Sequence, residues 1–529
     1  MLGRRDPQGS LFKVPFWAQG LVPQDSFYTR MGRLWSQVSQ DEDLAEMYAE
    51  NQGAPSIPPS IVSGALILQY FDGVSDREAA DRLRFDLRWK LALGLPLDDQ
   101  GFHYSSFSRF RTRLAHHGLE RYAFDKLVQL AIKTGLLVKD AEQVVDSTAI
   151  HGAAALQDTY TLIRNGMRKL LVAMGESDPA RRRLAKRLKL ERYLSNKKPE
   201  LDWGDADARR AHLQELVADG QRLLAEAKAT PPPEDSEGQA ACALLDQLLG
   251  QDIEEEDDGR YQIKDGVARD RIISTVDPEM RHGRKSASTR FDGYKGHVAV
   301  EPTTGLITNV EVRPGNEYDG GAAEELVSEQ AERYALKPKA IIGDHAYTDA
   351  ERRHLFTQQG IEVVGPVSSR NRSERFPKSA FQIDLTGGTV TCPAGESTDM
   401  YTSRSDRRGR QWRTFFFPPE VCQDCPLRSR CTAAKGTGRS IRIHPYEALL
   451  QAARAYQETD EFKGRYRSAR STVERTIAHL VRHGFRLARY LGRAKVKLQV
   501  LWAAAAVNLQ RLMALIAEGL APRVAAHMA

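Results

Sequence analysis

Two aspartates stand in sequence contexts that favour chemistry over plain structure. Asp146 lies inside the β-branched run QVVDSTAI, where a charged side chain is costly unless it is paired or binds a cation. The alternative is an aspartate that accepts hydrogen bonds from nearby backbone. Asp344 ends the apolar run KAIIGD, and the capping box from Thr348 to Glu351 already supplies the start of the next helix. Asp344 is therefore expected to be free for a functional role.

Glu474 is the only acidic residue between Lys463 and Lys497, a span that contains eleven lysines and arginines. At helical spacing many of these cations share one broad face, which is the pattern expected for binding a phosphate backbone. Ser471 and Glu474 also match a capping box, so a helix that begins at Ser471 is the structural alternative for this glutamate.

The three carboxylates make chemical sense together. Two aspartates on strands and one glutamate on a helix can share two divalent cations, and ligation by oxygen alone suits Mg²⁺, or Mn²⁺ as a substitute. Two such ions activate an attacking hydroxyl and stabilise the leaving oxygen in phosphodiester displacement. The predicted catalytic and metal-binding set is Asp146, Asp344 and Glu474.

A second group of candidate ligands consists of cysteines. Cys392, Cys422, Cys425 and Cys431 fall in one segment, and the C-x-x-C spacing of the middle two is typical of a zinc knuckle. The alternative is four ordinary reduced cysteines, because only one knuckle is regular. Cys242 lies in the apolar run ACALLDQLL and is expected to pack in a core.

Composition limits the class of protein. A chain of 529 residues is expected to form several structural units, and five cysteines exclude a secreted disulfide framework. The net charge of +6 does not by itself indicate a polyanionic partner, so the local basic face carries that argument. No signal-peptide pattern opens the chain. The apolar stretch Leu498–Ala517 contains Asn508, Gln510 and Arg511, which favours a buried helix, no membrane association and a soluble cytoplasmic protein.

The elements that position these residues follow from periodicity. Residues 1–55 show little periodicity and are expected to be irregular. From Ser60 to Leu114 three helices are expected, one beginning at a Ser75–Glu78 capping box. They are similar to a helix-turn-helix module, and a plain bundle with solvated arginines is the alternative.

After the first strand, Gln143–Ile150, the charged region 162–256 is helical, with its acidic runs in solvated loops. A hairpin is expected over 293–301 and 305–314, followed by helix, strand, helix and strand. The fold class is multi-domain α/β, a mixed sheet flanked by helices. The predicted division is an N-terminal helical DNA-binding domain (1–135), the first core strand (140–160), a helical insertion (161–265), the continued catalytic core (266–370), a Cys-rich zinc-ribbon-like insertion (371–445) and C-terminal catalytic and basic helices (446–520).

The motifs around the three carboxylates, DSTAI, GDHAYTD and RSTVERTIAHL, resemble those of the DDE transposases of bacterial insertion sequences. So do FDGYKGHVAVEPTTGLITNVEVRPGNEYDG and, nearer the N-terminus, DGVSDREAADRLRFDLRWKLALG. The order of the elements is similar to the RNase H-like core. The resemblance implies that Asp146, Asp344 and Glu474 are the metal-binding triad and that Arg470 is the family's arginine. Tyr466 matches the family's tyrosine with three intervening residues where two are usual.

The same resemblance implies a DNA transposase that cuts double-stranded DNA at the transposon's terminal inverted repeats and joins the 3′-hydroxyl ends to target DNA. It implies two Mg²⁺ or Mn²⁺ ions, a homo-oligomer assembled on DNA and a bacterial, nucleoid-associated location; the cysteines add a structural Zn²⁺. The residues expected to contact DNA are Arg109, Arg111, Arg113, Arg467, Arg470, Arg475, Arg482, Arg486 and Arg489.

Two other functions remain open: a catalytically inactive DNA-binding derivative, and an RNase H-like nuclease without strand transfer. His345 and Tyr347, beside Asp344, are compatible with either a substrate contact or a structural role. His297 is expected to face solvent or the sheet, and Asp292 and Asp319 are spare carboxylates that do not displace the triad.

Overall fold

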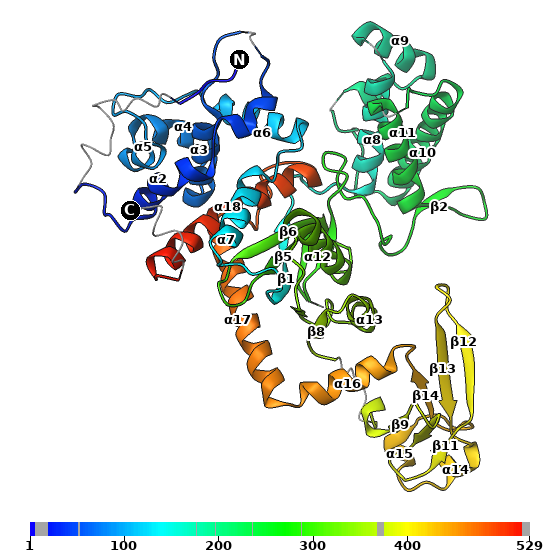
Figure 1. The fold of residues 1–529 in the computed structure, drawn as a ribbon. Coiled ribbons are helices and arrows are strands. Elements are labelled where there is room, and N and C mark those ends of the chain that lie inside the picture. The colour runs from blue at the N-terminus through cyan, green and yellow to red at the C-terminus, as the bar shows by residue number, and fades with distance from the viewer. Residues whose placement is uncertain are drawn as a thin grey trace.

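The computed structural model describes residues 1–5, 20–50, 53–367 apart from 176, 196, 235 and 287, and 375–520. Figure 1 shows a central sheet with helices around it, an N-terminal helical unit, a second helical unit and a small β-rich unit. The boundary predicted at 370/371 lies outside the described residues. The fold is mixed α/β, as the sequence predicted.

The central sheet has six strands: β1 (Gln143–His151), β4 (Arg281–Arg284), β5 (Arg290–Val300), β6 (Ile307–Pro314), β7 (Ala340–Ile342) and β8 (Glu362–Val364). Strand β1 is central. It pairs antiparallel with β5 on one side and parallel with β7 on the other, and β8 continues parallel to β7. The predicted hairpin is confirmed, because β6 pairs antiparallel with β5. The short β4 pairs with the beginning of β5.

Helices cover both faces of this sheet. Strand β1 alternates its side chains, so that Val144 and Ile150 belong to the large apolar core and Val145 to a smaller core on the opposite face. The helices α12 (Gly320–Tyr334) and α13 (Ala350–Gln358) pack on the Val145 face. The helices α17 (Asp460–Arg482) and α18 (Arg493–Ala517) pack on the other. The two faces therefore have separate apolar layers, with the sheet between them.

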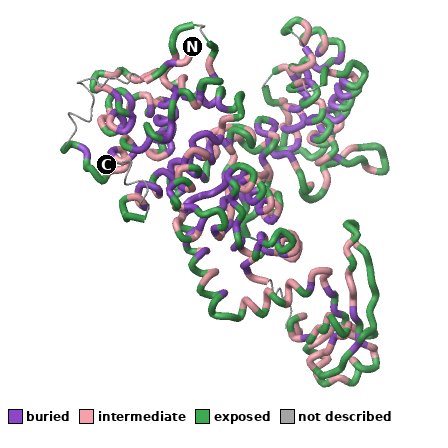
Figure 2. Tube along the Cα trace, in the orientation of Figure 1, coloured by how far each residue is buried: buried purple, intermediate pink, exposed green. Residues whose placement is uncertain are grey.

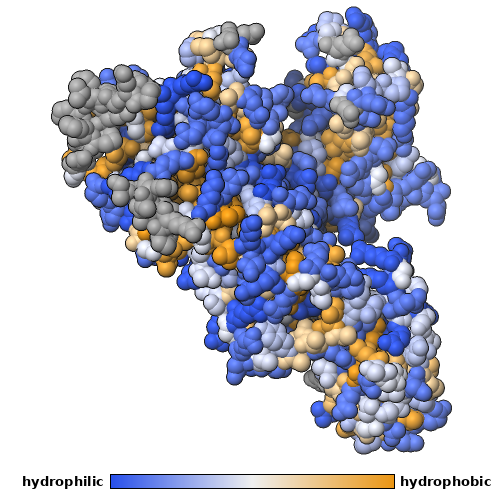
Figure 3. Space-filling model, viewed as in Figure 1, coloured by the Kyte–Doolittle hydropathy of each residue, from blue (hydrophilic) through white to orange (hydrophobic). Residues whose placement is uncertain are grey.

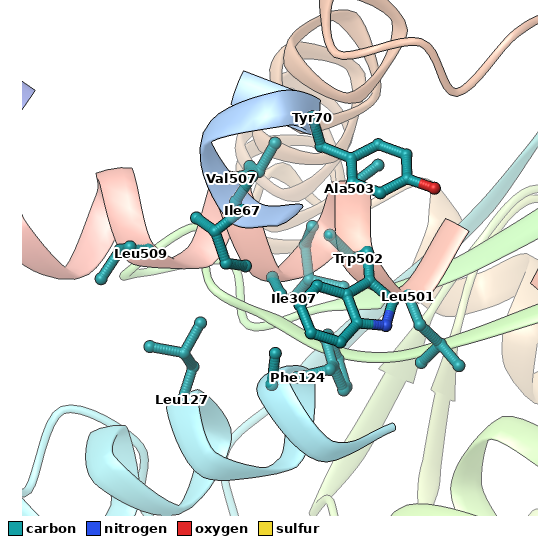
Figure 4. Close-up of a cluster of buried hydrophobic side chains, with 14 of the residues drawn as sticks. Ile67, Tyr70, Phe124, Leu127, Ile307, Leu501, Trp502, Ala503, Val507 and Leu509 are labelled. Atoms are coloured by element: carbon teal, nitrogen blue, oxygen red, sulfur yellow. The ribbon is translucent and has the colours of Figure 1, made fainter. Parts of the chain in front are cut away.

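Helix α18 joins the sheet to the N-terminal unit. Figure 4 shows Trp502 and Val507 of α18 among side chains from β6 and from the N-terminal helices. This helix is the one in the described residues that is long and apolar enough to cross a membrane, and 72% of its apolar window is buried inside the fold. It is a core helix here, as its polar residues predicted.

The N-terminal unit contains α2 (Phe27–Val38), η1 (Glu42–Met47), α3 (Pro59–Asp72), α4 (Asp76–Phe85), α5 (Leu87–Leu93), α6 (Ser105–His116) and α7 (Tyr122–Lys133). The expectation of an irregular start was wrong for α2, which Ser26 caps and which buries Leu34 and Trp35 at helical spacing. The capping box is confirmed, because the Ser75 hydroxyl accepts from the Glu78 backbone N–H at 3.2 Å. The predicted helix trio contains a further helix, α5, which the Asp86 carboxylate caps.

Between β1 and β4 lies a helical unit made of α8 (Thr159–Met174), α9 (Asp178–Leu188), η2 (Glu191–Leu194), α10 (Ala206–Ala229) and α11 (Glu237–Asp252), followed by the hairpin β2 (Ile253–Glu255) and β3 (Tyr261–Ile263). Its apolar side chains form a core that is separate from the core around the sheet. Part of the acidic run expected to be a loop forms this hairpin. The unit stands apart from the sheet in Figure 1.

The Cys-rich unit contains two three-stranded sheets. One sheet is formed by β9 (Gln382–Asp384), β10 (Thr389–Thr391) and β11 (Ser397–Thr398), and the other by β12 (Tyr401–Ser405), β13 (Gln411–Phe416) and β14 (Ser440–Ile443). The unit also contains the short helices η3 (Lys378–Ala380), α14 (Pro419–Gln423) and α15 (Arg428–Cys431). Helix α16 (Glu447–Gln457) connects it to α17. Figure 2 shows few buried residues here, and most of the surface visible in Figure 3 is hydrophilic. Near the hairpin tip, Arg408 and Arg410 both form ion pairs with Glu351 on α13.

Candidate active site

Asp146 lies in the middle of β1, on the face that α17 covers. Its backbone pairs with Val298 of β5, and its Oδ1 accepts from the Ser147 backbone N–H at 2.8 Å. The side chain is 14% exposed. Burial raises the pKa of the Asp146 carboxyl above its ordinary value, Arg470 opposes this rise, and the charge of Asp344 adds to it. The strand thus holds a carboxylate whose charge depends on its neighbours.

Asp344 lies just beyond the end of β7, in a turn that it stabilises itself. Its Oδ1 accepts from the Ala346 backbone N–H at 2.9 Å, and its carbonyl accepts from the Thr348 hydroxyl at 2.9 Å. The prediction that Thr348 caps the next helix was wrong: Asp349 is the cap, since its carboxylate accepts from the Arg352 backbone N–H. Thr348 is oriented toward the turn instead of the helix.

Topology brings the two aspartates to the same edge of the sheet. Val144 of β1 is paired in parallel with Ile342 of β7, and each aspartate follows its paired residue by two positions. The carboxyl ends of adjacent parallel strands point the same way, so both side chains lie near one edge. The charge of Asp344 accordingly contributes to the raised pKa of Asp146.

Glu474 comes from the middle of a long helix. Helix α17 begins at Asp460, where the Thr459 hydroxyl accepts from the Phe462 backbone N–H at 3.2 Å. The alternative of a helix start at Ser471 is therefore excluded, and Glu474 has no capping role. Its side chain is 63% exposed, in contrast to Asp146.

Arg470 links the strand to the helix. Its Nη1 lies 3.0 Å from the Asp146 carboxylate and its Nη2 lies 3.3 Å from Glu474, one turn along α17. Burial alone would lower the pKa of Arg470, but the charge of Asp146, with those of Glu474 and Asp344, raises it above its ordinary value. Two of the three predicted acidic residues thus form ion pairs with one guanidinium, and the charge of the third, Asp344, also acts on it. Tyr466 lies one turn earlier, and burial, together with the charges of Asp344 and Asp146, raises its pKa against the opposing charge of Arg470.

In the part of the chain that the structure describes, no three His, Cys, Asp or Glu side chains are grouped closely enough to hold a metal ion. Two of the acidic side chains are bound to Arg470 instead. The chemistry of the donors nevertheless fits Mg²⁺, because all three are carboxylates, one from a strand, one from the turn after β7 and one from a helix. The Nη1 atom of Arg470 is buried and makes no aligned hydrogen bond, so its contact with Asp146 is an ion pair.

A polar network lies on the opposite face of the sheet, behind Asp146. The Tyr347 hydroxyl and His297 Nδ1 form a 2.6 Å hydrogen bond, and both side chains are fully buried. The Ser147 hydroxyl donates to Asp319, which also accepts from Lys295 at 2.6 Å. The sequence alone predicted no specific role for these residues. The signal that could have indicated the network is the alternation of side chains along β1, which places Ser147 on the face of the sheet opposite to Asp146.

The two remaining polar candidates lie outside this network. His345 is exposed at the turn, and Asp292 forms an exposed pair with His282 at 2.5 Å. Neither is bonded to the three acidic residues in the contacts that the structure records for them. They offer no argument for a catalytic role.

The arginines predicted to contact DNA differ in exposure. Arg111 is buried and pairs with Asp76 at 2.5 Å, and Arg489 donates to the Val74 carbonyl at 3.0 Å, so both make contacts inside the fold. Arg470 is half-buried in the site. The exposed members of the set are Arg109, Arg113, Arg467, Arg475, Arg482 and Arg486.

The four clustered cysteines are free thiols, each half-buried. Three of them, Cys392, Cys422 and Cys431, pack against the small core of their unit, and the Arg439 backbone N–H donates to Cys422 Sγ at 3.5 Å. Burial raises the pKa of the Cys431 thiol, Arg439 opposes the rise, and the charges of the other three thiolates add to it. Cys242 packs against the core of the helical insertion, as expected.

Comparison with known proteins finds two transposase family models that match separate parts of the chain. Residues 17–113 match a family described as a transposase domain (DUF772), and residues 391–513, which include Arg470 and Glu474, match a transposase DDE domain. No curated protein matches the chain. A cryo-EM structure of a piggyBac transposase synaptic complex with hairpin DNA aligns with 97% of this chain and 77% of its own at 9% identity, but its TM-score of 0.28 carries no argument. A transposase family model thus matches near each end of the chain, and the two matches support an insertion-sequence DDE transposase.

Proposed function

We propose that the protein cuts DNA at transposon ends and joins the 3′-hydroxyl ends to target DNA, with Asp146, Asp344 and Glu474 as the catalytic acids. One observation carries this proposal. Asp146 of β1 and Glu474 of α17, remote in the chain, both form ion pairs with Arg470, and the charge of Asp344, after β7, acts on the same arginine. Such a convergence has no evident structural purpose, because Glu474 does not cap its helix.

The sheet supports an RNase H-like core. Its central strand β1 has the antiparallel β5–β6 hairpin on one side and the parallel strands β7 and β8 on the other, with helices on both faces. In this arrangement Asp146 lies on β1, the first strand of the sheet in chain order, and Asp344 follows β7, the fifth. This is the order in which the family motifs occur along the chain.

Each acidic residue has a distinct part in the proposed chemistry. Two bound Mg²⁺ or Mn²⁺ ions would activate the attacking hydroxyl and stabilise the leaving oxygen of the phosphodiester. Asp146 and Asp344 are fixed by a strand and a tight turn, so they provide the rigid part of the site. Glu474 is exposed on a helix and provides the third carboxylate from the side where DNA must approach. Arg470 balances their charge in the absence of DNA.

DNA is proposed to lie along the exposed side of α17. Arg467, Arg475 and Arg482 are exposed on this helix and carry positive charge next to Glu474. Arg109 and Arg113, exposed on α6, are proposed to contribute to recognition of the terminal repeats. Arg111 and Arg489 are assigned to internal packing because of their contacts with Asp76 and Val74. Pairing of two DNA ends would need a homo-oligomer on DNA.

The Cys-rich unit is proposed to bind one structural zinc ion. Its four cysteines supply the thiolates that tetrahedral zinc prefers, and a backbone N–H already donates to one sulfur. Coordination would require the thiols to draw together from their present positions. Zinc would supply stability to the unit and no chemistry.

An integration assay tests the catalytic proposal. The full-length protein is incubated with DNA that carries the ends of its element, a supercoiled target plasmid and Mg²⁺. Joined products are expected from the wild type, and Asp146→Asn and Glu474→Gln are each expected to reduce them by about 100-fold or more, since each removes a metal-binding charge.

The matched control is Asp292→Asn, the same change at an exposed aspartate on β5 that is paired with His282. It should leave joining unchanged. Nicked plasmid without joined products would indicate a nuclease, and DNA binding without any cleavage would indicate an inactive derivative. Full joining by Asp146→Asn would exclude the proposed site.

A further inference from the structure

The polar network behind Asp146 connects the two strands that carry the catalytic aspartates. Ser147 is the neighbour of Asp146 on β1, and successive residues of a strand point to opposite faces. Tyr347 is three residues after Asp344, and its backbone N–H donates to the Asp344 carbonyl at 3.2 Å. The Tyr347 hydroxyl bonds His297 of β5, which is paired in register with Ser147 of β1. One buried phenol is therefore connected to the chain next to both aspartates, directly at Asp344 and through His297 at Asp146.

The turn at Asp344 is packed around this tyrosine. A side chain at Gly343 would place its Cβ 2.8 Å from Tyr347 Cβ and 3.1 Å from Val145, so only glycine fits between β7 and Asp344. Tyr347 is fully buried and belongs to the apolar core that also contains Val145 and Ile341, the residues that flank it on β1 and β7. Its position is therefore fixed by packing as well as by hydrogen bonds.

A second part of the network fixes Ser147 from the other side. The Ser147 hydroxyl donates to Asp319 at 3.2 Å, and Lys295 pairs with the same carboxylate at 2.6 Å. Asp319 immediately precedes α12, and Lys295 lies on β5 two residues before His297. Side-chain hydrogen bonds thus join β1, β5 and the residue before α12 beneath the aspartates, and the bond between Tyr347 and His297 joins β5 to the turn after β7.

Burial of so many polar groups on an apolar face is costly unless their geometry is needed. An apolar residue at Ser147 or Tyr347 could pack this core equally well by volume. We propose that Tyr347, with His297 and Ser147, is a positioning network that sets the separation of the Asp146 and Asp344 carboxylates and thereby the affinity of the site for divalent cations. This inference rests on the proposed function. Tyr347 acts through the two aspartates and is not itself a catalytic residue.

The test compares full-length wild type and Tyr347→Phe. Mn²⁺ binding is measured by the electron paramagnetic resonance signal of free Mn²⁺, and cleavage of end-bearing DNA is measured over a range of Mg²⁺ concentrations. Residues that orient metal ligands typically change metal affinity by about 10- to 100-fold. We expect Tyr347→Phe to raise the Mn²⁺ dissociation constant and the half-maximal Mg²⁺ concentration by about tenfold, while cleavage at saturating metal falls less than about twofold.

The matched control is Tyr294→Phe. Tyr294 is also fully buried in this sheet, and its hydroxyl donates to Asp277 at 2.6 Å, away from the two catalytic aspartates. It should leave the Mn²⁺ affinity unchanged. If Tyr347→Phe does not fold, Ser147→Ala removes the other hydroxyl of the network with little change in volume and carries the same expectation.

The outcomes separate this inference from the proposed function. A wild type that neither binds Mn²⁺ nor cleaves would overturn both. A wild type that cleaves, with a variant that has unchanged Mn²⁺ affinity, would overturn the positioning network alone. A variant with slower cleavage at saturating Mg²⁺ but an unchanged Mg²⁺ midpoint would also contradict it, because that result indicates a general structural defect.

Discussion

The carboxylates proposed as catalytic differ in their surroundings. Asp146 is largely buried, and burial raises its pKa while the charge of Arg470 opposes the rise. Glu474 is mostly exposed and can move with solvent. A site with one rigid and one mobile acidic residue can admit DNA on the mobile side while the strand keeps its geometry.

His297 provides a prediction about pH. Burial lowers the pKa of His297 to about 3 from its ordinary 6.5, so the folded protein holds this ring neutral. The unfolded chain binds the proton below pH 6.5 and the folded chain does not, so stability must fall as pH decreases through this range. At pH 5 the loss relative to neutral pH should be about 2 kcal/mol.

Denaturant unfolding of the wild type and of His297→Gln at pH 7.5 and pH 5 checks this prediction. Glutamine does not titrate, so the wild type should lose about 2 kcal/mol more than the variant between the two pH values. Other histidines titrate equally in both proteins and cancel. Equal losses would show that His297 is protonated in the folded state.

At this scale the sequence predicts residue types better than contacts. The residue types and contexts of Asp146, Asp344 and Glu474 predict a site, and the family resemblance adds Arg470 to it. The ion pair between Arg470 and Asp146 could not be predicted, because it joins residues that only the packing of α17 on β1 brings together. Tyr347 and His297 were equally ambiguous, since a buried hydrogen bond between them needs the sheet register.

At the scale of elements, N-terminal helix caps explain both the correct and the wrong predictions of where helices begin. Ser75 is a correct cap because its capping box has no competitor nearby. Thr348 and Ser471 match the same motif, yet neither starts a helix. The Thr348 hydroxyl bonds the Asp344 turn, and Ser471 lies inside α17, which began at Asp460. Local motifs cannot reveal that a longer helix or a nearby turn already uses the residue.

The packing of α18 on β6 depends on one polar residue. The Asn508 side chain accepts from the Ile307 backbone N–H and donates to the Ile307 carbonyl, each at 2.8 Å, and it is 2% exposed. It satisfies backbone groups at the outer edge of β6, where no further strand pairs. Asn508→Leu would leave both groups buried without a partner, and should lower the free energy of unfolding by about 2–4 kcal/mol.

The denaturation midpoint followed by tryptophan fluorescence measures this effect, because Trp502 lies on the same helix. The control is Asn165→Leu, the same change at a half-buried position on α8, whose core is separate. It should change stability by less than about 0.5 kcal/mol. An Asn508→Leu protein with wild-type stability would mean that water replaces both bonds.

On the scale of the whole molecule, the number of cores differs from the number of predicted domains. The N-terminal helices, the sheet and α18 share one apolar core, in which Trp35, Phe124 and Ile307 all take part. The helical insertion and the Cys-rich unit have their own. Sequence periodicity identifies where apolar faces occur, but it does not reveal which faces pack against one another. The shared core keeps the N-terminal arginines in a fixed relation to the acidic residues.

The Cys-rich unit has too small a core to be stable on apolar burial alone. In the described residues its buried apolar side chains are Phe381, Val390, Phe415, Phe417, Ile441 and Ile443. Units of this size usually need a metal or a crosslink, and its cysteines are free. We expect about one zinc ion per chain by elemental mass spectrometry, lost in the double variant Cys422→Ser/Cys425→Ser.

Loss of zinc should unfold this unit and leave the others intact, since its core shares no residue with theirs. Limited proteolysis of the double variant, or of the wild type after chelation, should therefore cut within 375–445 while the sheet and the helical insertion stay protected. Cys242→Ser is the matched control, because Cys242 packs against the insertion core and should keep the zinc. If the wild type contains no zinc and is protected from proteolysis to the same extent as the variant, the four thiols are ordinary reduced cysteines. The ion pairs of Arg408 and Arg410 with Glu351 would then contribute more than the cysteines to holding the unit in place.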